Sequence, residues 1–413
     1  MVSGGLPSRR HIHLTAVAGG VRFFSVQPPR HWLSPALAVG LLLLCLAGSA
    51  PAQVWTKTGA PNKSWIAAAS SADGNKLVAA FQGSSGGIYL STNAGATWTA
   101  AAVPAKYWTG LASSADGGVL LAVASYNGTT GGVYTSTNSG GTWVSNAVPV
   151  NFYQMGATAV SASGKTLIVG GVVSSPGLAY YSTNMGATWS SNGLPTGGYW
   201  SSVACTGDGA VAKLAADWGG TLYTSTNGGA TWANNNLGGS SILVSSADAS
   251  HLFLYGSGMS VSTNWGASWQ SASQPNGYMQ LASSSDAKRL VGLYAGNVYV
   301  STDFGATWLM SYAPNKTWKS IGLAADGTKM VAVPSATSDG IYVWQPPVLN
   351  YTNNAGSVRL AWPTNGTTFT LQTLPNLTAT NWVNVGGSTV SNSLRQVTLP
   401  LTNDSGFYRL QSP

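Results

Sequence analysis

The carboxylates of this chain are the first residues to consider for catalysis, and few of them are free for it. All ten acidic residues are aspartates. Six of them occupy short turns between predicted strands, where aspartate commonly accepts hydrogen bonds from its own backbone. These six are Asp73, Asp116, Asp208, Asp248, Asp286 and Asp326. Outside these turns, and outside the repeated motif described below, Asp217, Asp339 and Asp404 remain.

Asp217 and Asp339 are the candidate catalytic pair. Hydrolysis of a glycosidic bond usually requires two carboxylates that lie roughly 5 to 10 Å apart. The repeat pattern places both residues on one face of the predicted fold, but in repeats that are three steps apart, so we expect them to be too distant. Glycine follows Asp339, which favours a role in a turn. We therefore predict no catalytic residue and keep these two as the only candidates for a hydrolase.

Other reaction chemistries lack the residues that they need. His251 and Cys205 are the only histidine and the only cysteine after residue 52, so neither a histidine-based triad nor a zinc cluster can be assembled. The glycines do not form a phosphate-binding Gly-Lys loop. The lysines are scattered along the chain, which argues against a nucleic-acid partner. The sequence thus predicts no metal, no cofactor and no nucleic acid.

Aromatic residues at repeated positions are stronger candidates for a binding site. Six predicted repeats have an aromatic residue where their first strand begins. These residues are Trp65, Trp108, Tyr153, Trp200, Tyr278 and Trp318. Sugar rings stack on aromatic faces, while neighbouring polar side chains bond the hydroxyl groups. We predict that these rings bind a ligand at the mouth of a central channel; packing inside the fold is the alternative for the same positions.

The elements that position these residues come from an internal repeat. The segment STNAGATW at residues 91–98 recurs as STNSGGTW, STNMGATW, STNGGATW, STNWGASW and STDFGATW. The spacing of these copies suits one four-stranded unit per repeat. First strands are predicted near residues 65, 108, 153, 200, 242, 278 and 318. The predicted fold is therefore all-β, a seven-bladed β-propeller.

The last repeat lacks a fourth strand, and the start of the repeat region offers a replacement. In complete repeats, a proline and then an aromatic residue follow the motif tryptophan at fixed distances. Trp55, Pro61 and Trp65 have the same spacing although no motif turn precedes them. We predict that residues 54–61 form the outer strand of the seventh blade, which removes the exposed sheet edges that an open array would have.

The repeated turn resembles the Asp-box (BNR) motif, Ser-x-Asp-x-Gly-x-x-Trp. The region from about 55 to 344 accordingly resembles the propellers of sialidases, xyloglucanase-type glycosidases, sortilin-type receptors and photosystem assembly factors. The resemblance implies the fold but no single function. The acidic position needs a short side-chain oxygen for the turn, which asparagine also supplies. It is occupied by Asn93, Asn138, Asn184, Asn227, Asn264 and Asp303. Arg289 is the only arginine of the propeller region, so the arginine cluster of a sialidase is missing.

Two further segments flank the propeller, which is assigned residues 53–345. Residues 1–52 contain four arginines, no acid and an apolar run that ends in Ala-Pro-Ala, so we predict a cleaved secretory signal, with an uncleaved anchor as the alternative. Residues 348–413 resemble the small β-sandwich modules at the C-termini of secreted bacterial proteins. We expect a monomer that is secreted, periplasmic or held at the cell surface, without stable membrane insertion after cleavage.

Composition limits the function further. Only 7% of the residues are charged while 44% are hydrophobic, so the chain can form a core and is not a disordered protein. We predict a secreted, non-catalytic binding protein whose partner is a glycan or an extracellular protein, and whose ligand lies at the channel mouth. A glycoside hydrolase of the same superfold, other than a sialidase, and a protein-assembly scaffold are the alternatives.

Overall fold

The fold consists of two compact units. The computed structural model describes residues 12–16, 22–26, 55–83, 85–125, 131–148, 157–171, 178–191, 200–209, 212–216, 221–227, 231–236, 240–256, 258–272, 280–311, 313–336, 339–345, 350–354, 357–363, 370–374, 381–391, 394–400 and 407–411. One unit is Trp55–Trp344, and the other combines Met1–Val54 with Gln345–Pro413. The regular elements of the described residues are β-strands, as the sequence predicted. Among them, no helix is long and apolar enough to cross a membrane.

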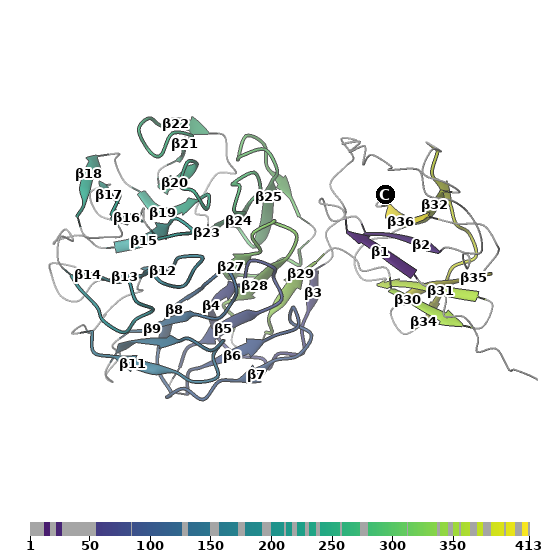
Figure 1. Ribbon diagram of the computed structural model, residues 1–413, viewed down its shortest axis with the longest axis horizontal. Coiled ribbons are helices and arrows are strands. Elements are labelled where there is room, and N and C mark those ends of the chain that lie inside the picture. Colours follow the sequence, from purple (N-terminus) through teal and green to yellow (C-terminus); the bar gives the residue numbers. More distant parts are fainter. Residues whose placement is uncertain are drawn as a thin grey trace, which may run out of the picture. The chain divides into compact units, whose positions relative to one another are not determined.

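The described strands of Trp55–Trp344 form seven antiparallel sheets, which we number as blades in chain order (Figure 1). Blade one contains β4 (Trp65–Ser70), β5 (Leu77–Phe81), β6 (Gly87–Ser91) and β7 (Thr99–Ala100), and blade two contains β8 (Trp108–Ser113), β9 (Leu120–Ala124), β10 (Gly132–Ser136) and β11 (Val144–Asn146). The described part of blade three contains β12 (Ala157–Val160), β13 (Leu167–Gly171) and β14 (Leu178–Ser182). Blade four contains β15 (Trp200–Cys205), β16 (Ala212–Ala216), β17 (Thr221–Ser225) and β18 (Ala233–Asn236). Blade five contains β19 (Ser240–Ser245), β20 (Leu252–Gly256), β21 (Met259–Ser262) and β22 (Gln270–Ala272). Blade six contains β23 (Gln280–Ser283), β24 (Leu290–Tyr294), β25 (Asn297–Ser301) and β26 (Leu309–Met310), and blade seven contains β27 (Trp318–Leu323), β28 (Met330–Pro334), β29 (Tyr342–Trp344) and β3 (Trp55–Lys57).

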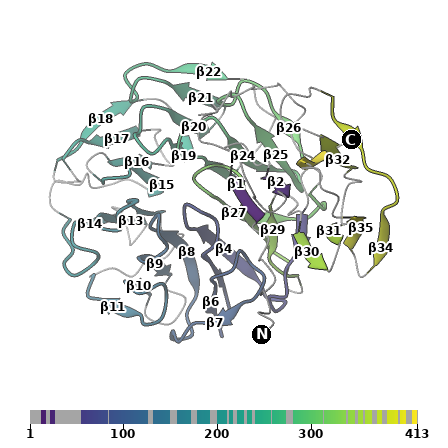
Figure 2. The same ribbon diagram turned by 45° about the vertical axis from the view of Figure 1, so that its right-hand side comes forward.

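The outer strand of blade seven comes from the beginning of this unit. β3 pairs with β29 in antiparallel register, with Trp55 opposite Trp344 and Lys57 opposite Tyr342. The predicted closing strand is confirmed. The first strand of blade one, β4, contacts both β8 of blade two and β27 of blade seven, so the last blade packs against the first. Figure 2 shows first strands such as β4, β8 and β15 near the middle, and outer strands such as β7, β11 and β18 at the periphery.

Backbone hydrogen bonds connect the blades on one face. In the turns between first and second strands, each blade donates one N–H group to a carbonyl oxygen of the next blade. The donor and acceptor residues are Ala72 and Ala115 (2.7 Å), Ala115 and Ala162 (3.0 Å), Ser163 and Gly207 (3.2 Å), Gly207 and Ala247 (2.7 Å), Ala247 and Ser285 (2.8 Å), Ser285 and Ala325 (2.8 Å), and Ala325 and Ala72 (2.8 Å). The last bond returns to the first blade, so these turns form a closed hydrogen-bonded ring.

The repeated STN segments, which we call box turns, lie on the same face as this ring. In blade one, the Ala94 N–H group of the box turn donates to the Asn75 carbonyl at 2.8 Å. In blade six, Phe304 donates to the Lys288 carbonyl at 3.1 Å. We call this face the bottom. The loops that lead from one blade into the first strand of the next lie on the opposite face, the top.

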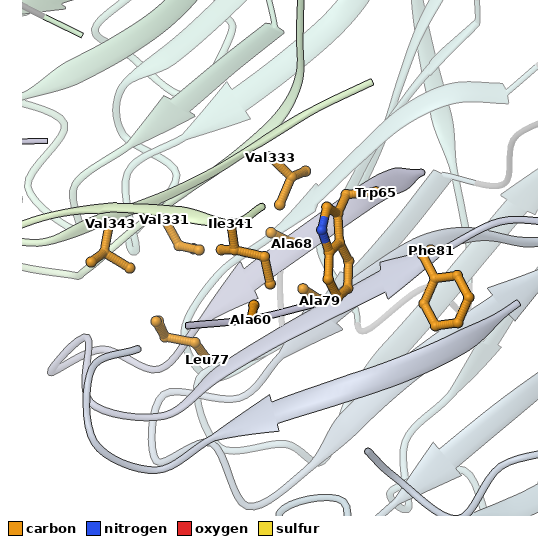
Figure 3. Close-up of a cluster of buried hydrophobic side chains, with 10 residues drawn as sticks. All are labelled: Ala60, Trp65, Ala68, Leu77, Ala79, Phe81, Val331, Val333, Ile341 and Val343. Atoms are coloured by element: carbon orange, nitrogen blue, oxygen red, sulfur yellow. The ribbon is translucent and has the colours of Figure 1, made fainter. Parts of the chain in front are cut away.

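The core of the propeller lies between adjacent blades. The second strands β5, β9, β13 and β28 are buried along their whole length, because both of their faces contact neighbouring sheets. Figure 3 shows one such cluster, in which Trp65 and Leu77 of blade one pack with Val331, Val333 and Val343 of blade seven. Burial of each such side chain contributes about 1.5–3 kcal/mol to the free energy of unfolding.

The second unit contains two antiparallel sheets. One has the order β30 (Asn350–Asn354), β31 (Ser357–Pro363), β35 (Leu394–Pro400) and β34 (Thr389–Ser391). The other has the order β1 (Ile12–Ala16), β2 (Arg22–Val26), β36 (Phe407–Gln411), β32 (Thr370–Leu374) and β33 (Val383–Asn384). Leu360 and Val397 of the first sheet share a core cluster with Leu371 of the second, which is the packing that a sandwich requires.

Two strands of the second unit come from the segment in which the sequence predicts a secretory signal. These are β1 and β2, and Phe24 of β2 pairs with Tyr408 of β36. Residues 12–16 alternate apolar with polar side chains, a pattern that strands share. Cleavage after residue 52 stays a prediction.

Candidate functional site

The aromatic residues that the sequence proposed as ligand contacts are core residues where the structure describes them. Trp65, Trp108, Trp200 and Trp318 are 1%, 0%, 1% and 9% exposed. A ring this deeply buried offers no face on which a sugar can stack, so these four positions have the packing role that the sequence left open. The two tyrosines of the set, Tyr153 and Tyr278, lie outside the described residues.

A break in strand register explains why these rings turn away from the channel. In each of the four blades the pairing of the first and second strands shifts directly after the tryptophan, as it does between Trp108 and Gly110. Such a bulge re-aims a side chain. The Trp108 ring then meets the Tyr134 ring of the third strand edge to face, with centroids 5.1 Å apart, and packs on residues of blade one such as Ile88. A third-strand tyrosine follows in each of these repeats, and it was the available sequence signal for this packing.

The box turns are held by their own side chains. In blade three, Asn184 Oδ1 accepts hydrogen bonds from the Ser182 hydroxyl and from the Thr188 N–H group, both at 2.9 Å, and Asn184 Nδ2 donates to Thr188 Oγ1 at 2.8 Å. Gly186 has φ 89°, a conformation that favours glycine. The same side-chain contacts recur in four other box turns, at Asn93, Asn138, Asn227 and Asn264.

Asp303 shows how the acidic version of the turn works. Its carboxylate accepts the Thr307 N–H group at 2.9 Å and the Thr307 hydroxyl at 2.6 Å. The threonine hydroxyl therefore accepts in an asparagine turn and donates in the aspartate turn, so both residues fit. The box tryptophans are not central core residues, since Trp189 is half-buried and packs at the margin of a cluster. The first-strand tryptophans take the central positions.

The aspartates of the bottom turns are likewise structural. Asp248 accepts hydrogen bonds from the Ser246 hydroxyl at 2.5 Å and from the Ser250 N–H group at 2.9 Å. The bond from Ser246, together with those from Ser250, lowers the pKa of the Asp248 carboxyl to about 2. Comparable bonds from Ser71, Ser114 and Ser284 serve Asp73, Asp116 and Asp286. These carboxylates stabilise their own turns.

Asp339 is a buried carboxylate at the top of blade seven. It is 7% exposed, and its two oxygens lie 3.2 Å from Lys57 Nζ and 3.0 Å from Lys316 Nζ. It also accepts the Gly340 N–H group at 2.8 Å and the Tyr342 hydroxyl at 3.1 Å. Burial alone would raise the pKa of this carboxyl, but the bonds from Lys316, Gly340, Lys57 and Tyr342 outweigh it and lower the pKa to about 2.

The other candidate of the proposed catalytic pair, Asp217, lies outside the described residues, as does Asp404. The structure therefore gives no distance between Asp217 and Asp339. Among the described residues, no group of three or more His, Cys, Asp or Glu side chains is placed to hold a metal ion.

The top face carries a set of lysines that sequence reasoning missed. Lys63, Lys106 and Lys316 each stand two residues before a first-strand tryptophan, in the loops that enter blades one, two and seven. Each carbonyl accepts the N–H group of that tryptophan, at 3.0, 3.0 and 2.8 Å. Lys57 and Lys319 lie on the same face. The lysines are far apart in the chain and therefore looked scattered, but the repeated pattern Pro-x-Lys-x-Trp was the signal that could have found three of them.

The comparisons with known proteins concern the fold. No family model and no curated protein matches the sequence. YCF48 from Cyanidioschyzon merolae has a TM-score of 0.53 and 13% identity, with 71% of this chain and 98% of that chain covered. The GH74 xyloglucanase from Xanthomonas campestris has a TM-score of 0.52 and 16% identity, and the match spans 75% of this chain and 59% of that chain. The β-propeller domain of Cps50 from Myceliophteria thermophila has a TM-score of 0.55 and 11% identity, with 71% and 99% covered. Trp55–Trp344 is thus a β-propeller, as the sequence predicted.

Proposed function

We propose that this chain is a secreted, non-catalytic binding protein, and that a glycan or an extracellular protein binds to the top face of its propeller. The observation that carries the proposal is the state of Asp339. It is the only carboxylate that the described residues place on the top face, and it is engaged by Lys57, Lys316, Gly340 and Tyr342 at once.

Such a carboxylate is poorly suited to acid catalysis. A general acid must hold a proton at the working pH, for which enzymes raise the pKa of a carboxyl group. The pKa of Asp339 is shifted the other way, to about 2. Nucleophilic attack is also disfavoured, because both oxygens already face a lysine ammonium group.

The contacts of Asp339 instead suit a surface that must keep its shape. Lys57 belongs to β3 at the start of the propeller, whereas Lys316 precedes β27 near its end. One carboxylate therefore joins two segments that enter blade seven from different parts of the chain. A surface that is rigid before binding loses less conformational entropy when its ligand arrives.

Similar folds support a binding role in general terms. A YCF48 propeller with 14% identity and a TM-score of 0.51 was solved with a D1 peptide bound, so a propeller of this shape can hold a peptide. The GH74 neighbour from Xanthomonas campestris is a xyloglucanase, so a propeller of this shape also occurs in an enzyme that acts on a glycan. Both a protein and a glycan are therefore kept as partners at this level of the proposal.

The experiment uses a chain that begins at Gln53, directly after the predicted cleavage site. It is presented to a glycan array and to a set of extracellular proteins, with a parallel assay for newly formed reducing ends. We expect binding without hydrolysis. Asp217→Asn serves as the matched control, because Asp217 is the other candidate acid. Hydrolysis that disappears in Asp217→Asn would show that the chain is a glycosidase, contrary to the proposal.

A further inference from the structure

Three lysines occupy the same structural position in three consecutive blades. The N–H groups of Lys63, Lys106 and Lys316 donate to the carbonyls of Asp339, Gly86 and Gly296, at 3.1, 3.2 and 3.0 Å. Each acceptor belongs to the loop between the second and third strands of the preceding blade. The backbone of each lysine is thus held on both sides, by this bond and by the bond from the following tryptophan. Because blades seven, one and two are neighbours in the ring, the three positions form an arc along the top face.

Charge is distributed unequally between the two faces. Among the described residues of the propeller, the top face has Lys57, Lys63, Lys106, Lys316 and Lys319 against one carboxylate, Asp339. The remaining described aspartates of the propeller all lie in turns of the bottom face, together with Arg289, Lys76, Lys165, Lys288 and Lys329. The part of the top face that the structure describes therefore carries more positive than negative charge, although the sequence shows no basic run, and a ligand that approaches it benefits from negative charge.

We propose that this arc of lysines is a binding site for an acidic polysaccharide, one that carries carboxylate groups at regular intervals. The inference rests on the proposed function and names the ligand class of the same face. Lysine presents a compact positive charge on a flexible stem, so it can reach carboxylates that are spaced along a polymer. Arginine, by contrast, binds a single planar carboxylate with two parallel hydrogen bonds. Lys63 Nζ also lies 5.0 Å from the centroid of the Phe81 ring, so its stem follows the protein surface.

The backbone contacts favour a polysaccharide over an acidic peptide. One common way in which a peptide binds to a β-protein is to pair its main chain with free main-chain groups at a sheet edge. In the arc, the N–H and C=O groups of Lys63, Lys106 and Lys316 are already paired within the protein. The side chains remain charged, although Lys316 also pairs with Asp339 and Lys63 lies over the Phe81 ring. A polysaccharide with charged sugar rings can use this charge without main-chain partners.

The test measures binding of polygalacturonate by calorimetry and affinity electrophoresis, with a neutral hydroxyethyl cellulose and poly-glutamate as comparison polymers. The double variant Lys63→Gln and Lys106→Gln removes two charges from the arc and keeps the stems. The control double variant Lys165→Gln and Lys288→Gln removes two exposed charges from the bottom face. Melting temperatures of both variants verify that they fold.

We expect polygalacturonate to bind, the neutral polymer not to bind, and the arc variant to bind about tenfold more weakly, the scale for two exposed charge pairs. The control variant should bind like the parent protein. Binding should weaken as salt is raised, because exposed charges are screened. Equal affinity of the two double variants would overturn the proposal, and so would poly-glutamate binding as tightly as polygalacturonate with the same dependence on the lysines.

The outcomes also separate this inference from the proposed function. If the protein binds a neutral glycan or a protein without any effect of the arc variant, the binding function stands and the lysine arc is wrong. If the protein binds polygalacturonate through the arc but also cleaves it, the arc stands and the non-catalytic function is wrong.

Discussion

Replacement of Asp339 by asparagine tests whether the top of blade seven is held together by charge. The carboxyl pKa falls from 3.8 to about 2 in the folded protein. One pKa unit corresponds to about 1.4 kcal/mol, so the ionised form contributes roughly 2 kcal/mol to the free energy of unfolding at neutral pH. Because the folded pKa lies below the unfolded one, this contribution is complete above about pH 5 and is lost as the pH falls through about 2.

The assay is urea unfolding of the parent protein and of Asp339→Asn, followed by tryptophan fluorescence from pH 7 down to pH 2. The variant should be less stable by about 2 kcal/mol at pH 7, and the difference should shrink towards zero near pH 2. Other aspartates titrate equally in both proteins, so they cancel in the difference. Asp303→Asn is the matched control, and it should have a small effect because the other five box turns contain asparagine. A loss of stability that does not depend on pH would show that packing, not ion pairing, is responsible.

Three further predictions concern the fold. Trp108→Ala removes a fully buried ring and should lower the free energy of unfolding by about 3–5 kcal/mol in chemical denaturation. Trp189 is half-buried, so Trp189→Ala should lower the free energy of unfolding by clearly less. Equal losses in the two variants would contradict the assigned packing. Asn184→Asp should change stability by less than about 0.5 kcal/mol, because the Thr188 hydroxyl can donate instead of accept, and a large loss would refute that exchange. A chain that begins at Asn62 lacks β3 and leaves the edge of β29 unpaired. Calorimetry should therefore show aggregation or a lower melting temperature than for a chain that begins at Gln53, and unchanged stability would refute the closure.

The repeat architecture could be predicted from the sequence because its signals are local. Each box turn is completed within eight residues, where an oxygen of Asn184 reaches Thr188 and Gly186 takes a positive φ. A motif of this kind is visible as a string of letters. The closing strand was also predictable, because Trp55 and Trp65 keep the spacing of complete repeats after the chain has gone round the ring.

The orientation of the first-strand tryptophans could not be derived in this way. Simple alternation along a strand leaves open which face of the sheet a residue at the strand start will occupy. The register shift after Trp108 directs its ring between blades one and two, where the ring packs edge to face against Tyr134. A bulge depends on the pairing of two strands, and residue type alone does not specify it.

The charged site likewise depends on distances that only the folded chain creates. The all-β ring of repeats and its turns could be predicted from the sequence because they depend on contacts between residues that are close in the chain. The closing strand could be predicted because it repeats the spacing of the complete repeats. Folding brings Lys57 and Lys316 to the carboxylate of Asp339 and the backbone of Lys63 to its carbonyl, and it places Lys106 at the corresponding position of the next blade. Electrostatic attraction acts through space, so residues hundreds of positions apart in the chain form one site once the ring has closed.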